Sequence, residues 1–286
     1  MTIAHISDMH FGRIAHPGVV DALADDINAA GIDVVACSGD LTQRARRHEF
    51  AAARDFLDAL DPPTLVVPGN HDTYPWWHPI KRLTRPLGRY RRYISDAAHA
   101  QHRSATLYLL GLNSTRGFTI KGGRILPSQR QRMQRFFADA PSSALRVLML
   151  HHHLTKIRAL GSHDVARHAR AALDAAARAG VDLILCGHLH ISHIEPVEVV
   201  PGTHRIVVAT AGTATSSRGR KADRGVNFYN RIRITDEAFT VAEHRFDPAD
   251  EAFAVERQTT FRRADSEGPS ASSAPPALHA QHERTG

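Results

Sequence analysis

Short apolar runs alternate with amphipathic stretches along the first two thirds of the chain. The runs Ile3–Ser7, Asp33–Ser38 and Thr64–Val67 have the length and composition of buried strands. Between them, apolar side chains recur at three- and four-residue spacing over Pro17–Ala30 and His48–Leu60. This βαβαβ order predicts a largely parallel sheet that is covered by helices.

The alternation continues along the chain and then changes character. Further strands are expected at Ala105–Leu112, Leu145–Leu150 and Val181–Cys186, and helices at Pro127–Ala138 and Asp164–Ala179. The segment Pro75–His102 shows neither period and is predicted to be irregular. The last apolar runs are separated by turns, as antiparallel strands are: Arg205–Ala209, Val226–Ile234 and Phe239–Phe246. A mixed sheet, or two sheets packed face to face, would accommodate both halves.

Composition separates a folded body from a tail. The chain has 286 residues and is 42% hydrophobic, which is enough to form a sizeable core and excludes wholesale disorder. Residues 264–286 are rich in Ser, Ala and Pro and are predicted to be a disordered tail. We therefore expect one folded domain over residues 1–263. The net charge of +7 favours anionic partners.

Cysteine content and the N-terminal sequence bear on the compartment. Two cysteines, Cys37 and Cys186, are too few for a disulfide scaffold. We interpret them as small buried side chains, with a redox-sensitive pair as the alternative. The N-terminus lacks the basic and apolar regions of a secretory signal, and no apolar run is long enough to cross a membrane. A cytoplasmic location is the expectation.

Histidine is unusually frequent, with 20 residues, and several lie in short polar motifs that follow the predicted strands. The five motifs are Asp8-Met9-His10, Gly39-Asp40, Gly69-Asn70-His71-Asp72, His151-His152-His153 and Gly187-His188-Leu189-His190. Ligands of open α/β sheets bind at the carboxyl ends of the strands, so these side chains should converge on one crevice.

The converging donors are carboxylates, an amide and imidazoles, without thiolate. Such donors suit manganese, iron or zinc. Seven or eight of them are too many for one tetrahedral site, and they fit two metal ions that share a carboxylate. A pair of ions can stabilise both oxygens of an in-line phosphoryl displacement and can lower the pKa of a bound water.

In order and setting, these motifs resemble those of the calcineurin-like metallophosphoesterases, over about residues 3–245. The resemblance implies an α/β fold, a four-layer α/β/β/α sandwich with two mixed sheets. It also implies a role for each motif residue: Asp8, His10 and His190 on a first metal, Asn70, His151 and His188 on a second, and Asp40 bridging the two. His71 would stabilise the transition state or protonate the leaving oxygen, and Asp72 would orient His71.

The triple histidine departs from the family pattern. The family usually has His-His-Pro or His-x-Pro after this strand, and His153 stands where proline is usual. Counting from the end of the apolar run places the metal ligand at His151, whereas a shift of one residue would place it at His152. Contact of His152 or His153 with substrate is a second open alternative.

Within the family, the chain is most similar to the cyclic-nucleotide phosphodiesterase-like branch, known as class III. The shared features are Ser38–Thr42, Pro68–Asp72, Asn113-Ser114, Gly122–Ile125 and Gln129. The resemblance implies hydrolysis of a small phosphodiester, such as a cyclic nucleotide, by a hydroxide that bridges two metal ions of Mn, Fe or Zn. The alternatives are a nuclease, a hydrolase of phospholipids or nucleotide-sugar pyrophosphates, and a non-catalytic metal-binding scaffold.

The segment after the third motif is aromatic and then basic. Trp76 and Trp77 are expected either to line the crevice or to anchor the loop by burial. Residues 81–92 contain six Lys and Arg side chains and no acid. They form either a solvated face or a surface that attracts nucleic acid or an anionic membrane. The sequence does not determine the oligomeric state.

Overall fold

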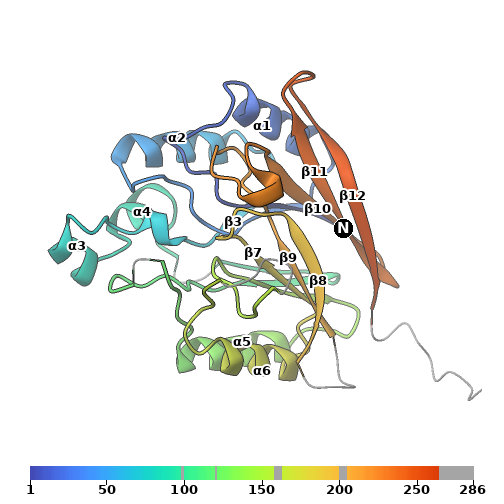
Figure 1. Cartoon of the computed structure of the whole chain (residues 1–286). Helices are drawn as coiled ribbons and strands as arrows, with labels where there is room; N and C mark the ends of the chain where they lie inside the picture. Colours follow the sequence, from blue (N-terminus) through green and yellow to red (C-terminus); the bar gives the residue numbers. More distant parts are fainter. Residues whose placement is uncertain (98–99, 120, 158–162, 200–204, 264–286) are drawn as a thin grey trace, which may run out of the picture.

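The computed structural model describes residues 1–97, 100–119, 121–157, 163–199 and 205–263 (Figure 1). The expected tail, 264–286, lies outside the described residues. Within the described residues, no helix combines the length and apolar character needed to cross a membrane.

The first sheet combines strands from both ends of the chain. Its order is β12-β11-β10-β1-β2-β3. The strands are β1 (Thr2–Ile6), β2 (Val34–Cys37), β3 (Thr64–Val66), β10 (Phe228–Ile234), β11 (Ala238–Asp247) and β12 (Ala252–Arg262). β1, β2 and β3 are parallel, as the βαβαβ pattern predicts, and β10, β11 and β12 add antiparallel pairs.

The second sheet comes from the middle of the chain. Its order is β4-β5-β6-β7-β9-β8. The strands are β4 (Gln101–Arg103), β5 (Leu107–Gly111), β6 (Leu145–Met149), β7 (Leu183–Cys186), β8 (His193–Glu198) and β9 (Arg205–Thr210). The four strands β5, β6, β7 and β9 pair in parallel, and β4 and β8 close the edges antiparallel.

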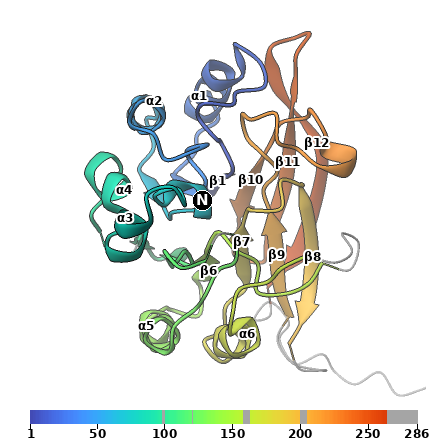
Figure 2. The same ribbon diagram turned by 60° about the vertical axis from the view of Figure 1, so that its left-hand side comes forward.

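Helices cover the outer face of each sheet (Figures 1 and 2). α1 (Val19–Ala29) and α2 (Arg47–Asp58) lie over the first sheet, and α5 (Pro127–Ala138) and α6 (Ala169–Arg178) lie over the second. Two short helices, α3 (Pro79–Thr84) and α4 (Gly88–Tyr93), lie to one side.

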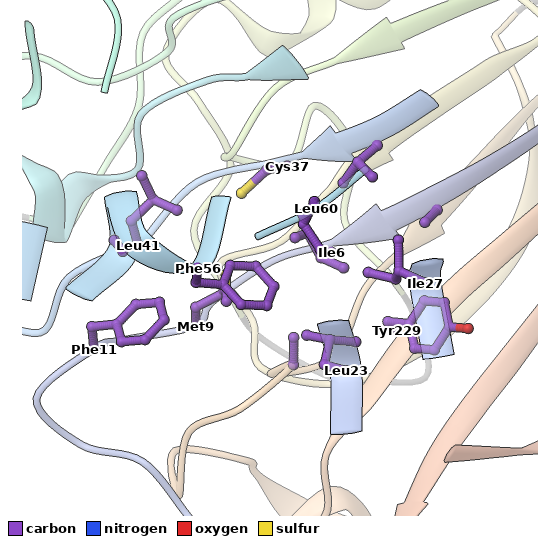
Figure 3. Close-up of a cluster of buried hydrophobic side chains, with 14 of the residues drawn as sticks. Ile6, Met9, Phe11, Leu23, Ile27, Cys37, Leu41, Phe56, Leu60 and Tyr229 are labelled. Carbon is purple, nitrogen blue, oxygen red and sulfur yellow. The ribbon is translucent and has the colours of Figure 1, made fainter. Parts of the chain in front are cut away.

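Three apolar clusters confirm the four layers. Along β1, Ala4 and Ile6 face the cluster that packs against α1 and α2, which Figure 3 shows, whereas Ile3 faces the cluster between the sheets. β6 alternates in the same way, with Val147 between the sheets and Leu148 facing α5 and α6. Because successive side chains point to opposite faces of a strand, each of these strands contributes side chains to two apolar clusters.

The structure corrects several expected elements. Pro75–His102 is wrong as a wholly irregular segment, because it contains α3, α4 and the start of β4. The helix expected over Asp164–Ala179 begins only at Ala169, since His168 has a positive φ of 63° and breaks the helical path. β8 and β12 were not expected, because much of each strand is exposed and about half of its residues are polar.

Candidate metal centre

The five polar motifs meet where the two sheets end. Asp8 follows β1, Asp40 follows β2 and Asn70 follows β3, so these three come from the first sheet. His151 follows β6 and His188 follows β7, in the second sheet. The carboxyl ends of parallel strands therefore bring together side chains that lie up to 180 residues apart in the chain.

The turns that carry these residues have a backbone conformation that L-amino acids rarely adopt. Positive φ angles occur at Asp8 (51°), His10 (47°), Asp40 (54°), His188 (72°) and His190 (58°). Each such residue costs on the order of 1–3 kcal/mol and persists only when the surrounding structure enforces it. Their concentration in these motifs marks a site that the fold maintains at a cost in stability.

A first group consists of Asp8, His10, Asp40 and His190, all buried, whose candidate ligand atoms lie within 4.8 Å of one another. Asp8 Oδ1 lies 3.1 Å from His190 Nε2, and His10 Nε2 lies 3.2 Å from the same nitrogen. Asp40 Oδ2 lies 3.7 Å from His10 Nε2. These atoms point at one small volume.

A second group surrounds His151. Its Nε2 lies 3.3 Å from Asn70 Oδ1 and 3.4 Å from Asp40 Oδ2. Ligand atoms of His151, His152 and His188 lie within 4.8 Å of one another. The backbone N–H of His188 donates to Asp8 Oδ2 at 2.8 Å, which ties the second group to the first.

Backbone carbonyls fix three of the imidazole rings. A carbonyl oxygen lies at hydrogen-bond distance from Nδ1 in each case: Thr42 with His10 (3.3 Å), Ser38 with His151 (2.9 Å) and Arg218 with His190 (3.0 Å). An Nδ1–H that donates to a carbonyl leaves the Nε2 lone pair facing the centre, which is the tautomer that a metal ligand needs.

Two orphaned oxygens test whether a cation fits this centre. Asp8 Oδ1 and Asp40 Oδ2 are buried and have no hydrogen-bond partner within the part of the chain that the structure describes. Buried carboxylate oxygens without a donor are costly, and here they face nitrogen lone pairs as well. Divalent cations satisfy all of these atoms together, so the donor set fits metal ions.

The pKa values of the buried acids and histidines also agree with a cation site. Burial alone would raise the pKa of Asp8, but the neighbouring His190, His10 and His151 outweigh it and hold the pKa well below the usual range. Burial lowers the pKa of His10 to about 4, so this ring is neutral, as a ligand must be. At His151, burial is outweighed by Asp40 and Asp8, which raise its pKa to about 9. The carboxylates attract positive charge to this point, as a proton or as a metal cation.

Two glycines are required by close approach to the carboxylates. A Cβ on Gly69 would lie 2.0 Å from Asp40 Oδ1, and a Cβ on Gly187 would lie 1.9 Å from Ser7 Oγ and 2.4 Å from Asp8 Oδ2. Any larger residue would displace a carboxylate of the centre. The motif glycines therefore let one loop pack directly on the ligand of another.

The model of the calcineurin-like phosphoesterase family matches residues 1–192, about two thirds of the chain. The chain belongs to this family. Both the resemblance and the α/β fold expected from the sequence are confirmed.

Comparison with individual proteins agrees with this assignment. Over 82 residues the chain is 39% identical to the glycerophosphodiester phosphodiesterase GpdQ of Enterobacter lignolyticus (strain SCF1), a match that spans 25% of this chain and 30% of the relative. A dimetal phosphatase from Danio rerio has the same fold, with a TM-score of 0.64 at 13% identity over 92% of this chain and 98% of that one. The purple acid phosphatase PPD1 of yellow lupin (Lupinus luteus) matches with a TM-score of 0.63 at 11% identity, over 96% of this chain and 57% of the phosphatase.

In this family member, His71 lies at the rim of the centre. It is half-buried, and its Nδ1 lies 2.7 Å from the carbonyl oxygen of Gln43, while its Nε2 has no hydrogen-bond partner among the described residues. Asp72 was expected to orient this ring, and the structure corrects that role. Its buried carboxylate instead accepts hydrogen bonds from the backbone N–H groups of Gly69, Leu41 and Thr42. Asp72 therefore holds two motif loops together.

The three rings of the triple histidine have different hydrogen-bond partners. Both nitrogens of the buried His152 ring are occupied, Nδ1 by Ser114 Oγ at 2.8 Å and Nε2 by the Lys121 carbonyl at 3.0 Å. The His153 ring is fully buried and lies 3.1 Å from the Gly187 carbonyl. Of the three rings, His151 is the one whose Nε2 lies within 3.4 Å of both Asp40 Oδ2 and Asn70 Oδ1.

Two neighbouring cavities open at the centre. One, of about 190 Å³, is lined by Asp40, Asn70, His71, His188 and His190 among others. The second, of about 340 Å³, shares Asn70 and His71 with it and extends to the two tryptophans. Lys121 and Arg218 line both cavities, and Gln43 and Arg44 line the larger one. The sequence motifs missed these four residues, because they lie in loops whose pattern carries no signal.

The aromatic and cysteine alternatives are also decided. Trp76 and Trp77 are 67% and 43% exposed and line the larger cavity, so burial as loop anchors is wrong.

Cys37 and Cys186 are fully buried, and burial raises the pKa of both thiols to about 12. Both behave as small core side chains, as expected.

Proposed function

We propose that this chain hydrolyses a small phosphodiester at a dinuclear metal centre. Asp8, His10 and His190 would hold one ion, and Asn70, His151 and His188 the other. The observation that carries the proposal is the position of Asp40. Its unpaired Oδ2 lies 3.7 Å from His10 Nε2 and 3.4 Å from His151 Nε2, between the two groups. A single carboxylate in that place suits a bridging ligand.

Bound there, the ions would act as Lewis acids toward the phosphoryl oxygens and would supply an acidified water as nucleophile near neutral pH. The identity of the ions, manganese, iron or zinc, is part of the proposal. His71, with Nε2 free at the rim, would donate a proton to the leaving oxygen or stabilise the charge that develops there. Asp72 would contribute by fixing the loop that carries His71.

The cationic side chains at the rim would bind the substrate phosphate. Arg218 and Lys121 line both cavities, so each can reach a phosphate that sits over the ligand groups. Burial lowers the pKa of Arg218, while Asp40 and Asp8 partly oppose that shift, so the guanidinium stays charged near these carboxylates. These residues would orient the phosphate before the chemical step.

A diester is favoured over a monoester by two observations. The stretch that is 39% identical to the glycerophosphodiester phosphodiesterase points to diester chemistry, although it spans only 30% of that relative. The larger cavity, next to His71, offers space for the second substituent that a diester has and a monoester lacks. Cyclic nucleotides and glycerophosphodiesters are the first substrates to examine. The location that we propose for the protein is the cytoplasm.

The test compares bis-p-nitrophenyl phosphate with p-nitrophenyl phosphate in the presence of manganese. The proposal predicts faster turnover of the diester, and loss of that turnover in Asp40→Ala while the circular dichroism spectrum is retained. A preference for the monoester would change the assignment to a phosphatase. Turnover of neither ester by folded, metal-loaded protein would refute a small-diester substrate and favour nucleic acid, a pyrophosphate, a lipid or a scaffold role.

A further inference from the structure

Exposed apolar side chains gather at one place on the molecule. Large apolar side chains that stand exposed in the described residues are Trp76, Trp77, Ile80, Leu83, Phe118 and Val255. All but Val255 lie on α3 or on the two segments that contact it. Ile80 and Leu83 are 77% and 66% exposed and share one face of α3, three residues apart. Figures 1 and 2 show α3 at the periphery, away from both sheets.

Arg82 holds this region in place. Its guanidinium is largely buried and donates to Thr73 Oγ1 at 2.9 Å, to the Tyr74 carbonyl and to the Thr119 carbonyl at 2.6 Å. Thr73 follows the His71 motif, and Thr119 follows Phe118. α3 is therefore hydrogen-bonded to the loop that follows His71 and to the segment that contains Phe118. These bonds hold the apolar side chains of α3 in a defined position.

The same region is basic. Between Asp72 and Asp96 the chain has no acidic residue. Lys81, Arg85 and Arg92 are exposed, and within the described part of the chain none of them pairs with a carboxylate. Exposed apolar side chains near cations that pair with no carboxylate are typical of surfaces that enter the headgroup region of an anionic bilayer.

Two other partners fit these observations less well. A second copy of the chain would bring two basic segments together, and like charges in contact are unfavourable. Nucleic acid would use the cations and could stack on Trp76 or Trp77, but it offers nothing for the aliphatic side chains of Ile80 and Leu83. An anionic bilayer takes the cations and the aliphatic side chains together.

We propose that Trp76, Trp77, Ile80, Leu83 and Phe118, flanked by Lys81 and Arg85, form a docking surface for anionic membranes. Because Trp76 and Trp77 also line the larger cavity, docking would turn the mouth of that cavity toward lipid headgroups. This last step rests on the proposed phosphodiesterase function, whereas the docking itself does not.

The test is sedimentation of the full-length protein with vesicles of phosphatidylcholine, alone or mixed with phosphatidylglycerol. The wild-type chain should bind the anionic vesicles at least several-fold better, and salt should weaken the binding because it screens exposed charges. The double variant Ile80→Ser/Leu83→Ser should bind at least about tenfold more weakly, since two aliphatic side chains no longer leave water. The matched control Val255→Ser removes a side chain of similar exposure (57%) on β12 and should bind like the wild type.

Hydrolysis of soluble bis-p-nitrophenyl phosphate separates the docking proposal from the functional one. It should be unchanged in Ile80→Ser/Leu83→Ser, because neither side chain lines either cavity. Absence of sedimentation, or an equal loss in Val255→Ser, would overturn the docking surface. Self-association that disappears in the double variant would assign the surface to a dimer, and tight binding of single-stranded DNA at the expense of vesicles would assign it to nucleic acid.

Discussion

The substitution Gly187→Ala tests how closely the loops are packed around the metal ligands. The added methyl group would lie 1.9 Å from Ser7 Oγ and 2.4 Å from Asp8 Oδ2. Relief of that overlap requires the hydroxyl, the carboxylate or the loop to move by about 1 Å, and a displacement of that size at a catalytic centre can cost about 100-fold in rate. We therefore expect kcat/KM for bis-p-nitrophenyl phosphate to fall about 100-fold, or about 2.7 kcal/mol of activation free energy.

The variant should still fold, because overpacking at one site costs about 1–3 kcal/mol of stability. The assay measures kcat/KM at saturating manganese together with the metal content of the purified protein. Gly122→Ala is the matched control, since a Cβ there meets nothing within 4 Å, and it should keep full activity. Full activity and metal content in Gly187→Ala would refute the proposed contact between this loop and Asp8.

Three further predictions follow from buried or half-buried side chains. Because the pKa of both thiols is raised to about 12, Cys37 and Cys186 should react with a thiol reagent at mildly alkaline pH only after unfolding, and rapid labelling of the folded chain would contradict their burial. Burial lowers the pKa of His5 from 6.5 to about 3, so only the unfolded chain takes up a proton at this position as the pH falls below 6.5. The free energy of unfolding should decline there by about 1.4 kcal/mol per pH unit for this residue, and the slope measured by urea titration should be shallower by that amount in His5→Gln. His71→Gln should slow hydrolysis of a diester with an alkyl leaving group by about 100-fold and affect a p-nitrophenolate leaving group far less, and equal losses would argue against proton donation.

The parallel half of the fold follows from the sequence because its strands are buried on both faces. Ile3–Ser7 and Asp33–Ser38 read as apolar runs, and they correspond to β1 and β2 within one or two residues. β8 and β12 could not be found in this way, since each exposes one face and about half of its residues are polar. The helices within Pro75–His102 are six residues long, too short to show a helical period.

The candidate ligands were predictable for a related reason. Each candidate ligand follows an apolar run directly. The predicted end of the strand and the residue types of the motif therefore identify Asp8, Asp40 and His151. The residues that orient them were not predictable, because carbonyls such as that of Arg218 act through the backbone and leave no trace in side-chain identity. The role of Asp72 could not be predicted for the same reason, since most of its partners are backbone N–H groups.

The number of metal ions bound per chain shows whether the centre is dinuclear. Protein dialysed against manganese and freed of unbound ions would be analysed by inductively coupled plasma mass spectrometry, with Asp40→Ala beside it. We expect two ions per wild-type chain and a clear loss in Asp40→Ala, because the Asp40 carboxylate lies between the two ligand groups. A single ion per wild-type chain, or an unchanged count in Asp40→Ala, would contradict a dinuclear centre bridged by this residue.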